Sequence, residues 1–159
     1  MADNDHIPTV QIRAEDGFSE TLTDLAQTFI QMGDSDLAAD ILSDKKKLEI
    51  NSQQSVEYIA KDEAAAAEKL IKERQYHSKS GYIGHGNLAH SIKIKSRSNG
   101  KTCDVYPTAT NDSYNYGQAF EFGLKSKNYP AQHPMKDSAD ALDKQIDERV
   151  QSAIDRSLS

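Results

Sequence analysis

The chain has 159 residues and a mass of 17.6 kDa, a length that usually folds as one domain. Apolar residues make up only 36% of it, so we expect a lean core whose apolar surface is partly completed by partner subunits. No run approaches the ~18–20 apolar residues of a membrane span, and residues 1–9 lack the apolar stretch of a signal peptide, so we expect a soluble chain made in the cytoplasm.

The formal charge of −6 is spread unevenly along the chain. Residues 1–74 carry 8 Lys and Arg against 16 Asp and Glu, residues 75–135 carry 7 against 3, and residues 136–159 carry 4 against 6. A weakly basic middle segment therefore lies between acidic flanks. This asymmetry can orient one subunit on another, but a middle segment of +4 (7 − 3) is far from the charge of a dedicated nucleic-acid-binding surface.

The N-terminal part is predicted to be helical after a flexible N-terminus over residues 1–17. Apolar residues at helical spacing predict a helix over 20–32, with Ser19 as its N-cap and Gly33 as its stop. The periodicity resumes after Ser35 for two turns. It predicts a second, short helix that ends at the basic run 45–47, near the negative end of the helix dipole.

The longest helix is predicted over 51–75, where the sequence has neither Gly nor Pro and where Asn51 and Gln54 resemble a capping box. Glu63 falls on its Ala-rich apolar stripe. We expect Glu63 to lie at the solvated edge of that stripe, and an ion pair with the basic middle segment is the alternative. The helical region thus spans 18–77, and a loop follows over 78–89 whose glycines match no phosphate-binding signature.

The dipeptide Asn99-Gly100 is the strongest local signal, because a type I′ turn requires a positive φ at both central residues. A turn at this dipeptide predicts antiparallel strands over about 90–97 and 102–108. The register separates an apolar face from a charged face. It pairs Ile92 with Pro107, Ile94 with Val105 and Ser96 with Cys103 on one face, and Lys93 with Tyr106 and Lys95 with Asp104 on the other.

The segment after the hairpin is predicted to complete the sheet and lead into a last helix. Alternation from Tyr114 predicts a third strand ending at Gly123, so that the sheet region spans 90–124. A linker over 125–136 precedes an amphipathic helix over 137–158. The predicted fold is α+β: one domain over 18–159, in which a small antiparallel sheet of three to four strands packs against the long helix and the C-terminal helix, with an N-terminal helical region.

The residue types that carry catalysis or hold metals form no recognised pattern. His77, His85, His90 and Cys103 fit no zinc signature, and residues 34–45 lack the Gly and Glu of a calcium loop. Cys103 falls at an inward strand position, where a thiol is usually inert, and the chain has no GxSxG elbow. We therefore predict no catalytic, cofactor-binding or metal-binding residues.

Four basic residues cluster near the predicted hairpin. They are expected on a solvated outer face, and contact with phosphate groups is the alternative. They are Lys93, Lys95, Arg97 and Lys101.

From Gly86 onward the chain contains short motifs in a definite order. G-N-L and S-I precede the hairpin, and a Tyr-rich approach to E-F-G, a P-A-x-x-P-M linker and the last helix follow it. In this order the chain resembles the head–tail joining, or tail-completion, proteins of long-tailed bacteriophages, the family that includes the minor tail protein Z of phage lambda. The likeness spans about 86–157, and it departs from the family pattern at His85 and over 81–84. The matching positions are Gly86, Leu88, Ser91, Ile92, Tyr116, Glu121, Phe122, Gly123, Pro130, Ala131, Pro134 and Met135.

The resemblance implies a structural virion protein, not an enzyme, that joins or completes the tail at the head–tail interface as a ring of identical subunits. Its other partners would be head-connector and tail-tube or tail-terminator proteins, with no membrane contact, and it would meet DNA only in the ring lumen. A tail-terminator role and a nucleic-acid-binding accessory role remain as alternatives. We expect subunit contacts at the loop 78–87 and at Tyr82, Tyr114, Tyr116, Lys93 and Lys95.

Overall fold

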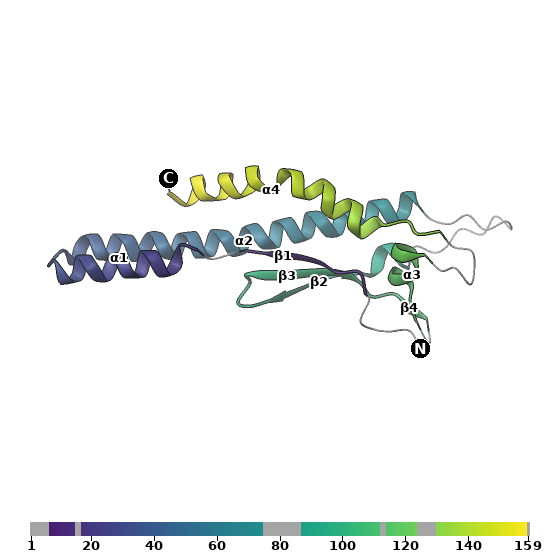
Figure 1. Cartoon of the computed structure of the whole chain (residues 1–159), viewed down its shortest axis with the longest axis horizontal. Helices are drawn as coiled ribbons and strands as arrows, with labels where there is room; N and C mark the ends of the chain where they lie inside the picture. The colour runs from purple at the N-terminus through teal and green to yellow at the C-terminus, as the bar shows by residue number, and fades with distance from the viewer. Residues whose placement is uncertain (1–6, 15–16, 75–86, 112–113, 124–129, 159) are drawn as a thin grey trace.

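Two antiparallel helices form the long axis of the molecule in this computed structural model (Figure 1). Helix α1 (Ser19–Gln31) turns at Gly33, whose φ of +87° suits glycine, into α2 (Ser35–Glu73). The side chain of Asp34 caps α2 by accepting a hydrogen bond from the amide of Leu37 at 3.1 Å. The structure describes residues 7–14, 17–74, 87–111, 114–123 and 130–158.

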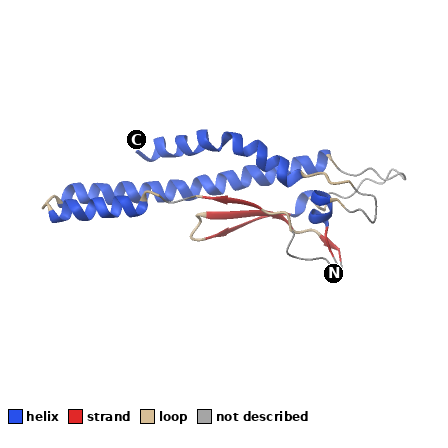
Figure 2. Cartoon of the chain, in the orientation of Figure 1, coloured by secondary structure: helices blue, strands red, loops and turns tan. Residues whose placement is uncertain are grey.

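The second half of α2 lies between a helix and a sheet (Figures 1 and 2). Helix α4 (Pro134–Leu158) runs along α2 on one side. On another side lies an antiparallel sheet in the order β1-β3-β2, built from β1 (Val10–Arg13), β3 (Thr102–Pro107) and β2 (Ile92–Arg97). The predicted α+β class, with a small antiparallel sheet against a long helix and a C-terminal helix, is confirmed.

Short elements surround the C-terminal end of α2. A 3-10 turn, η2 (Ala89–Ser91), precedes β2. After β3, the pair β4 (Thr110–Asn111) and β5 (Tyr114–Asn115) leads into helix α3 (Tyr116–Phe122). No helix in the described part of the chain is long and apolar enough to cross a membrane.

The buried side chains form two apolar clusters on α2. The smaller one joins Ile71 of α2 to Ala89 and Phe120. The larger one joins α2 to β1, β3 and the start of α4. Its buried members are Ile12, Val56, Ile59, Ala60, Ala67, Cys103, Val105 and Met135.

The predicted register of the hairpin is confirmed, although β2 begins at Ile92 and not at residue 90, and β3 ends at Pro107 and not at residue 108. All five predicted pairs, from Ile92 with Pro107 to Ser96 with Cys103, are paired residues of β2 and β3. Asn99 and Gly100 have φ values of 57° and 83°, and the amide of Lys101 donates to the carbonyl of Ser98 at 3.2 Å. The turn dipeptide and the alternation of apolar and polar residues both depend on neighbours in the chain. The register could therefore be predicted from the sequence.

Three predictions for the N-terminal part are wrong. The N-terminus expected to be flexible over 1–17 contains β1, because Ile12 enters the core beside Cys103. The short helix after Ser35 and the helix from Asn51 are one helix of 39 residues, since nothing between them stops a helix. Ser19 does not cap α1, because its hydroxyl donates to Glu49 of α2 at 2.9 Å.

Two predictions for the C-terminal part are also wrong. The third strand expected to end at Gly123 is mostly α3, and only residues 114–115 pair as β5. The third strand of the sheet is β1 instead. The last helix starts at Pro134 and not at 137, because a proline is tolerated in the first turn, where its missing amide has no helical partner.

Candidate functional site

The motif residues after the long helix fold into the turn that starts β2. The hydroxyl of Ser91 donates to the carbonyl of Leu88 at 2.7 Å and accepts from the amide of Thr108 at 3.2 Å. The Thr108 hydroxyl in turn donates to the carbonyl of Ser91 at 2.7 Å. Leu88 and Ile92 pack against the smaller apolar cluster. These residues therefore fix η2 and the end of β3 to the C-terminal end of α2.

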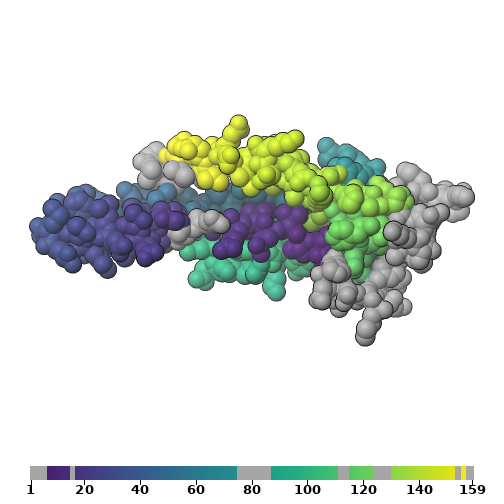
Figure 3. All heavy atoms as spheres, in the orientation of Figure 1, coloured from purple at the N-terminus to yellow at the C-terminus, as the bar shows by residue number. Residues whose placement is uncertain are grey.

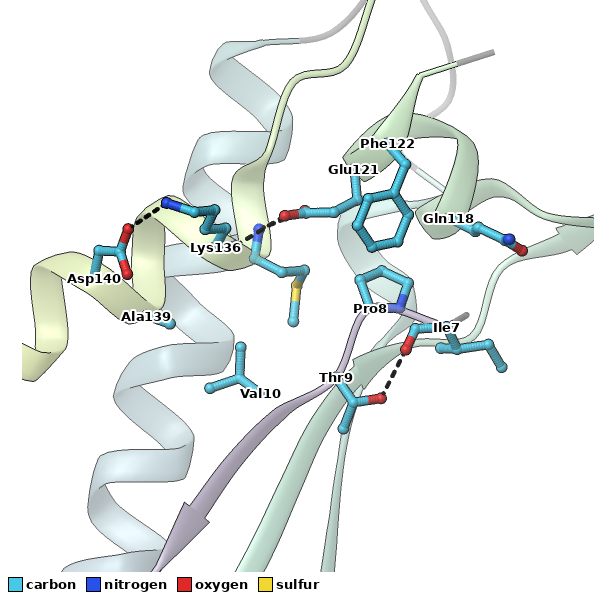
Figure 4. A pocket seen from close by; sticks show the side chains of 11 residues that line it. Ile7, Pro8, Thr9, Val10, Gln118, Glu121, Phe122, Lys136, Ala139 and Asp140 are labelled. Carbon is cyan, nitrogen blue, oxygen red and sulfur yellow. Dashed lines mark hydrogen bonds and ion pairs between the residues drawn. The ribbon is translucent and has the colours of Figure 1, made fainter. Parts of the chain in front are cut away.

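Glu121 joins the other two motif segments. Its side chain is 2% exposed and extends from α3 to the first turn of α4 (Figure 4). Its two carboxylate oxygens accept from the amides of Met135 at 2.8 Å and Lys136 at 3.0 Å. A carboxylate on unpaired amides at a helix N-terminus is favourable both as a hydrogen-bond acceptor and as a charge on the dipole. The E-F-G and P-M motifs thus form one contact, which we call the α3–α4 junction (Glu121, Met135, Lys136).

Asn115 and Gly117 position α3, and the sequence reading missed both. The Asn115 side chain caps α3 by accepting from the amide of Gln118 at 3.0 Å, and its amide group donates to the carbonyl of Pro107 at 3.3 Å. A Cβ on Gly117 would come within 2.1 Å of a side-chain atom of Pro107. The spacing of Asn115 and Gln118 is that of a helix N-cap, and this signal could have identified the helix.

Glu63 is the largest error among the predicted side-chain environments. It is 0% exposed, and one carboxylate oxygen accepts from the Ser138 hydroxyl of α4 at 2.6 Å. The other oxygen has no hydrogen-bond partner among the described residues. Burial, partly opposed by the Ser138 hydrogen bond and reinforced by the charge of Glu121, raises the pKa of Glu63 to about 7. Neither a solvated edge nor an ion pair describes this residue.

A hollow of about 730 Å³ lies beside the α3–α4 junction (Figure 4). It lies between β1, α3 and the first turns of α4, and Phe122, which is 56% exposed, lines it together with Pro8. The charged side chains in its wall are engaged, because Glu121 caps α4 and Lys136 pairs with Asp140 at 2.8 Å. Val10, Met135 and Ala139 also line the hollow, so apolar side chains make up much of its wall.

A second hollow, of about 700 Å³, is more apolar. It lies between β1, α2 and α4. Ile12, Phe18, Leu48 and Ile146 are among the side chains that line it. Val150, also in its wall, is 45% exposed.

The outer part of the helical hairpin is a further apolar surface. We define the arm as residues 19–50, which comprise α1, the turn at Gly33 and the first part of α2, and Figure 3 shows it projecting beyond α4 and the sheet. Only Ala26 and Ala38 are buried among the described arm residues. Six large apolar side chains of the arm are exposed by 38% or more. They are Leu25, Ile30, Met32, Leu37, Leu42 and Ile50.

Those predicted contact residues that the structure describes lie on different elements. Lys93 and Lys95 are exposed on β2, and Tyr116 is 36% exposed at the start of α3. The backbone of Tyr114 belongs to β5. Tyr82, Gly86 and most of the loop 78–87 lie outside the described residues. The described contact residues therefore come from β2, β5 and α3.

Of the residues considered for chemistry, His77 and His85 lie outside the described residues, and His90 is exposed in η2. Cys103 is 2% exposed in the core, and burial raises the pKa of its thiol, so the inward position predicted for it is confirmed. Among the described residues no group of three or more His, Cys, Asp and Glu side chains could hold a metal ion.

Comparison of the chain with protein-family models, with curated proteins and with solved structures found no match.

Proposed function

We propose that this chain is a structural subunit of a long-tailed phage virion that joins or completes the tail at the head–tail interface, acting as a ring of copies and without enzymatic activity. The observation that carries the proposal is the α3–α4 junction. Motifs that resemble the tail-completion family, Glu121 to Gly123 and Pro134 to Met135, are separated in sequence yet make one buried contact. Because the motifs that resemble the tail-completion family form one contact, they support a likeness in fold to that family. The proposed role rests on this likeness.

The exposed apolar surface supports an assembly role independently of the resemblance. The arm, the apolar hollow between β1, α2 and α4, and exposed Phe122 leave several hydrophobic areas uncovered in the single chain. Soluble monomers rarely expose such surface without a partner, because its burial is favourable. Burial of these areas by neighbouring copies accounts for both the low apolar content of the sequence and the exposed apolar side chains.

Virions of the phage that encodes the chain provide the test of place. Antibody labelling and electron microscopy are expected to place the chain at the neck or at the upper end of the tail, after its assembly in the host cytoplasm. Labelling only at the tail tip or in the capsid shell would contradict the proposal.

Deletion of the gene separates joining from termination. Filled heads together with free tails of normal length are the expected products if the chain joins heads to tails. Overlong tails would instead identify a tail terminator. Infectious virions of normal appearance would overturn both roles.

A nucleic-acid-binding accessory role is the second candidate, because Lys93, Lys95, Arg13 and Arg97 are exposed together on the sheet. Binding of duplex DNA that weakens steeply with salt would favour this role.

A further inference from the structure

The arm has a net negative charge of −4 (3 − 7 over residues 19–50), and its three lysines, Lys45, Lys46 and Lys47, lie together near its inner end. From Ser19 to Asp44 the sequence has six carboxylates and no Lys or Arg. Within the part of the chain that the structure describes, four of these carboxylates are exposed and have no ion-pair partner within 4 Å. They are Glu20, Asp24, Asp36 and Asp40. The arm therefore combines negative charge with exposed apolar side chains such as Ile30 and Met32.

The outer face of the sheet carries the opposite charge. Strand alternation turns Ile12, Cys103 and Val105 toward α2 and leaves the side chains between them on the other face. This outer face holds four cations and one carboxylate, a net charge of +3 (4 − 1). Asp104 pairs with Arg97 at 2.8 Å, and no described carboxylate lies within 4 Å of Arg13, Lys93 or Lys95. Three cations of this basic face are thus available to a partner.

One copy cannot bring these two surfaces together. Helix α2 is continuous from the arm to the part that supports the sheet, so the arm points away from the sheet along the long axis (Figure 1). The inner face of the sheet packs on α2, which turns the basic face outward. A contact between the arm and the basic face therefore requires a second copy, and each copy would then offer one surface and receive the other. Such a heterologous contact can close into a ring.

We propose that the acidic arm of one copy docks on the basic outer face of the sheet in the next copy. The inference deepens the proposed function, because it names the contact between neighbours in the ring. Duplex DNA is the other polyanion that the basic face could attract. It fits less well, because residues 19–50 of the same copy have a net charge of −4 (3 − 7) and would repel it.

A pair of charge reversals tests the contact with the full chain. The face variant carries Lys93→Glu and Lys95→Glu, and the arm variant carries Asp24→Lys and Asp40→Lys. All four side chains are exposed, so both variants are expected to fold, which circular dichroism checks. The control carries Lys69→Glu and Lys144→Glu, two exposed lysines on α2 and α4 outside both surfaces.

Sedimentation velocity at low and high salt then measures self-association. The unchanged chain and the control are expected to associate, more strongly at low salt. Each variant alone is expected to associate at least about tenfold more weakly, because the face variant sets like charges against each other and the arm variant leaves the arm without net charge. An equimolar mixture of the two variants is expected to associate again, because the unchanged acidic arm of the face variant then meets the unchanged basic face of the arm variant.

Three results would overturn the contact. The first is an unchanged chain that stays monomeric at low salt and millimolar concentration. The second is a mixture that fails to associate although both variants are folded. The third is binding of duplex DNA that depends on Lys93 and Lys95 without self-association, which would assign the face to nucleic acid.

Failure of the proposed contact can be distinguished from failure of the proposed virion role. Rings that are insensitive to all four reversals leave the neck role standing and remove this contact. Restored association of the mixture, combined with labelling away from the neck, keeps the contact and removes the role.

Discussion

Glu63 places an ionisable group inside the contact between α2 and α4. Ser138 satisfies one of its oxygens, and the charge of Glu121 adds to the cost of ionising it. Because its pKa is about 7 in the folded protein against 4.5 for an ordinary Glu, the folded state holds this proton more tightly than the unfolded chain. The free energy of unfolding that Glu63 contributes is therefore fully present below about pH 4.5 and is lost as the pH rises to about 7.

The substitution Glu63→Gln is expected to remove this pH dependence, since glutamine can accept the Ser138 hydrogen bond but does not titrate. Between pH 5 and pH 7.5 the unchanged chain should lose about 2 kcal/mol of stability that the variant does not lose. Urea unfolding at several pH values measures both. A variant that keeps the slope of the unchanged chain would show that Glu63 is not the group responsible.

Glu121 is the residue on which the start of α4 depends. Replacing it by alanine leaves the amides of Met135 and Lys136 without their acceptor, and the expected loss is about 1–2 kcal/mol, the range measured for lost helix caps. Urea unfolding gives the value. Glu148→Ala, at an exposed position of α4, is the matched control and should change stability by less than about 0.5 kcal/mol. Equal effects at both positions would refute the capping role.

At the scale of elements, α3 depends on the close approach of Gly117 to Pro107. Alanine normally favours a helix over glycine by about 1 kcal/mol. At this position the added Cβ would meet two side-chain atoms of Pro107 at 2.1 and 2.6 Å, so the helix or the end of β3 must shift. We therefore expect Gly117→Ala to destabilise the protein by about 2 kcal/mol, in the range of overpacked cores.

Gly17→Ala provides the control for this substitution. Nothing lies within 4 Å of the Cβ position at Gly17, so the expected change there is neutral or slightly stabilising. Thermal unfolding of the two variants compares them directly. Stabilisation by Gly117→Ala would contradict the close contact between α3 and Pro107.

At the scale of the whole molecule, the two ends of α2 differ in how well they are buried. The second half of α2 is covered by α4 and the sheet and contains the buried residues from Val56 to Ile71. The described part of the arm buries only two alanines, Ala26 and Ala38. Local opening therefore exposes little apolar surface at the arm and much more at the centre.

Native-state hydrogen exchange should show this difference. Amides of α1 and of residues 37–48 are expected to exchange through local opening, and amides of residues 59–71 only through larger unfolding. The arm should gain protection as protein concentration rises, if neighbouring copies cover it. Uniform protection along α2 would contradict the expectation.

The sequence by itself determined the features whose signals are local. Asn99 and Gly100 set a turn that fixes the pairing of β2 with β3, and the apolar spacing from Leu22 to Ile30 sets α1. Both depend on interactions between residues close in the chain, so they can be predicted without knowing the fold.

Only the tertiary structure decided the features that depend on distant partners. Val10–Arg13 became a strand because β3 offered a free edge, and α2 remained continuous because the expected break at 45–51 has no stop signal and its residues pack on α1. Glu63 is buried because α4 closes over it, and Glu121 acts as a cap because α3 lies beside the start of α4. Burial and pairing between segments 14 to 95 residues apart come from the assembled fold, because the spacing of residues along one segment does not specify which other segment will cover it.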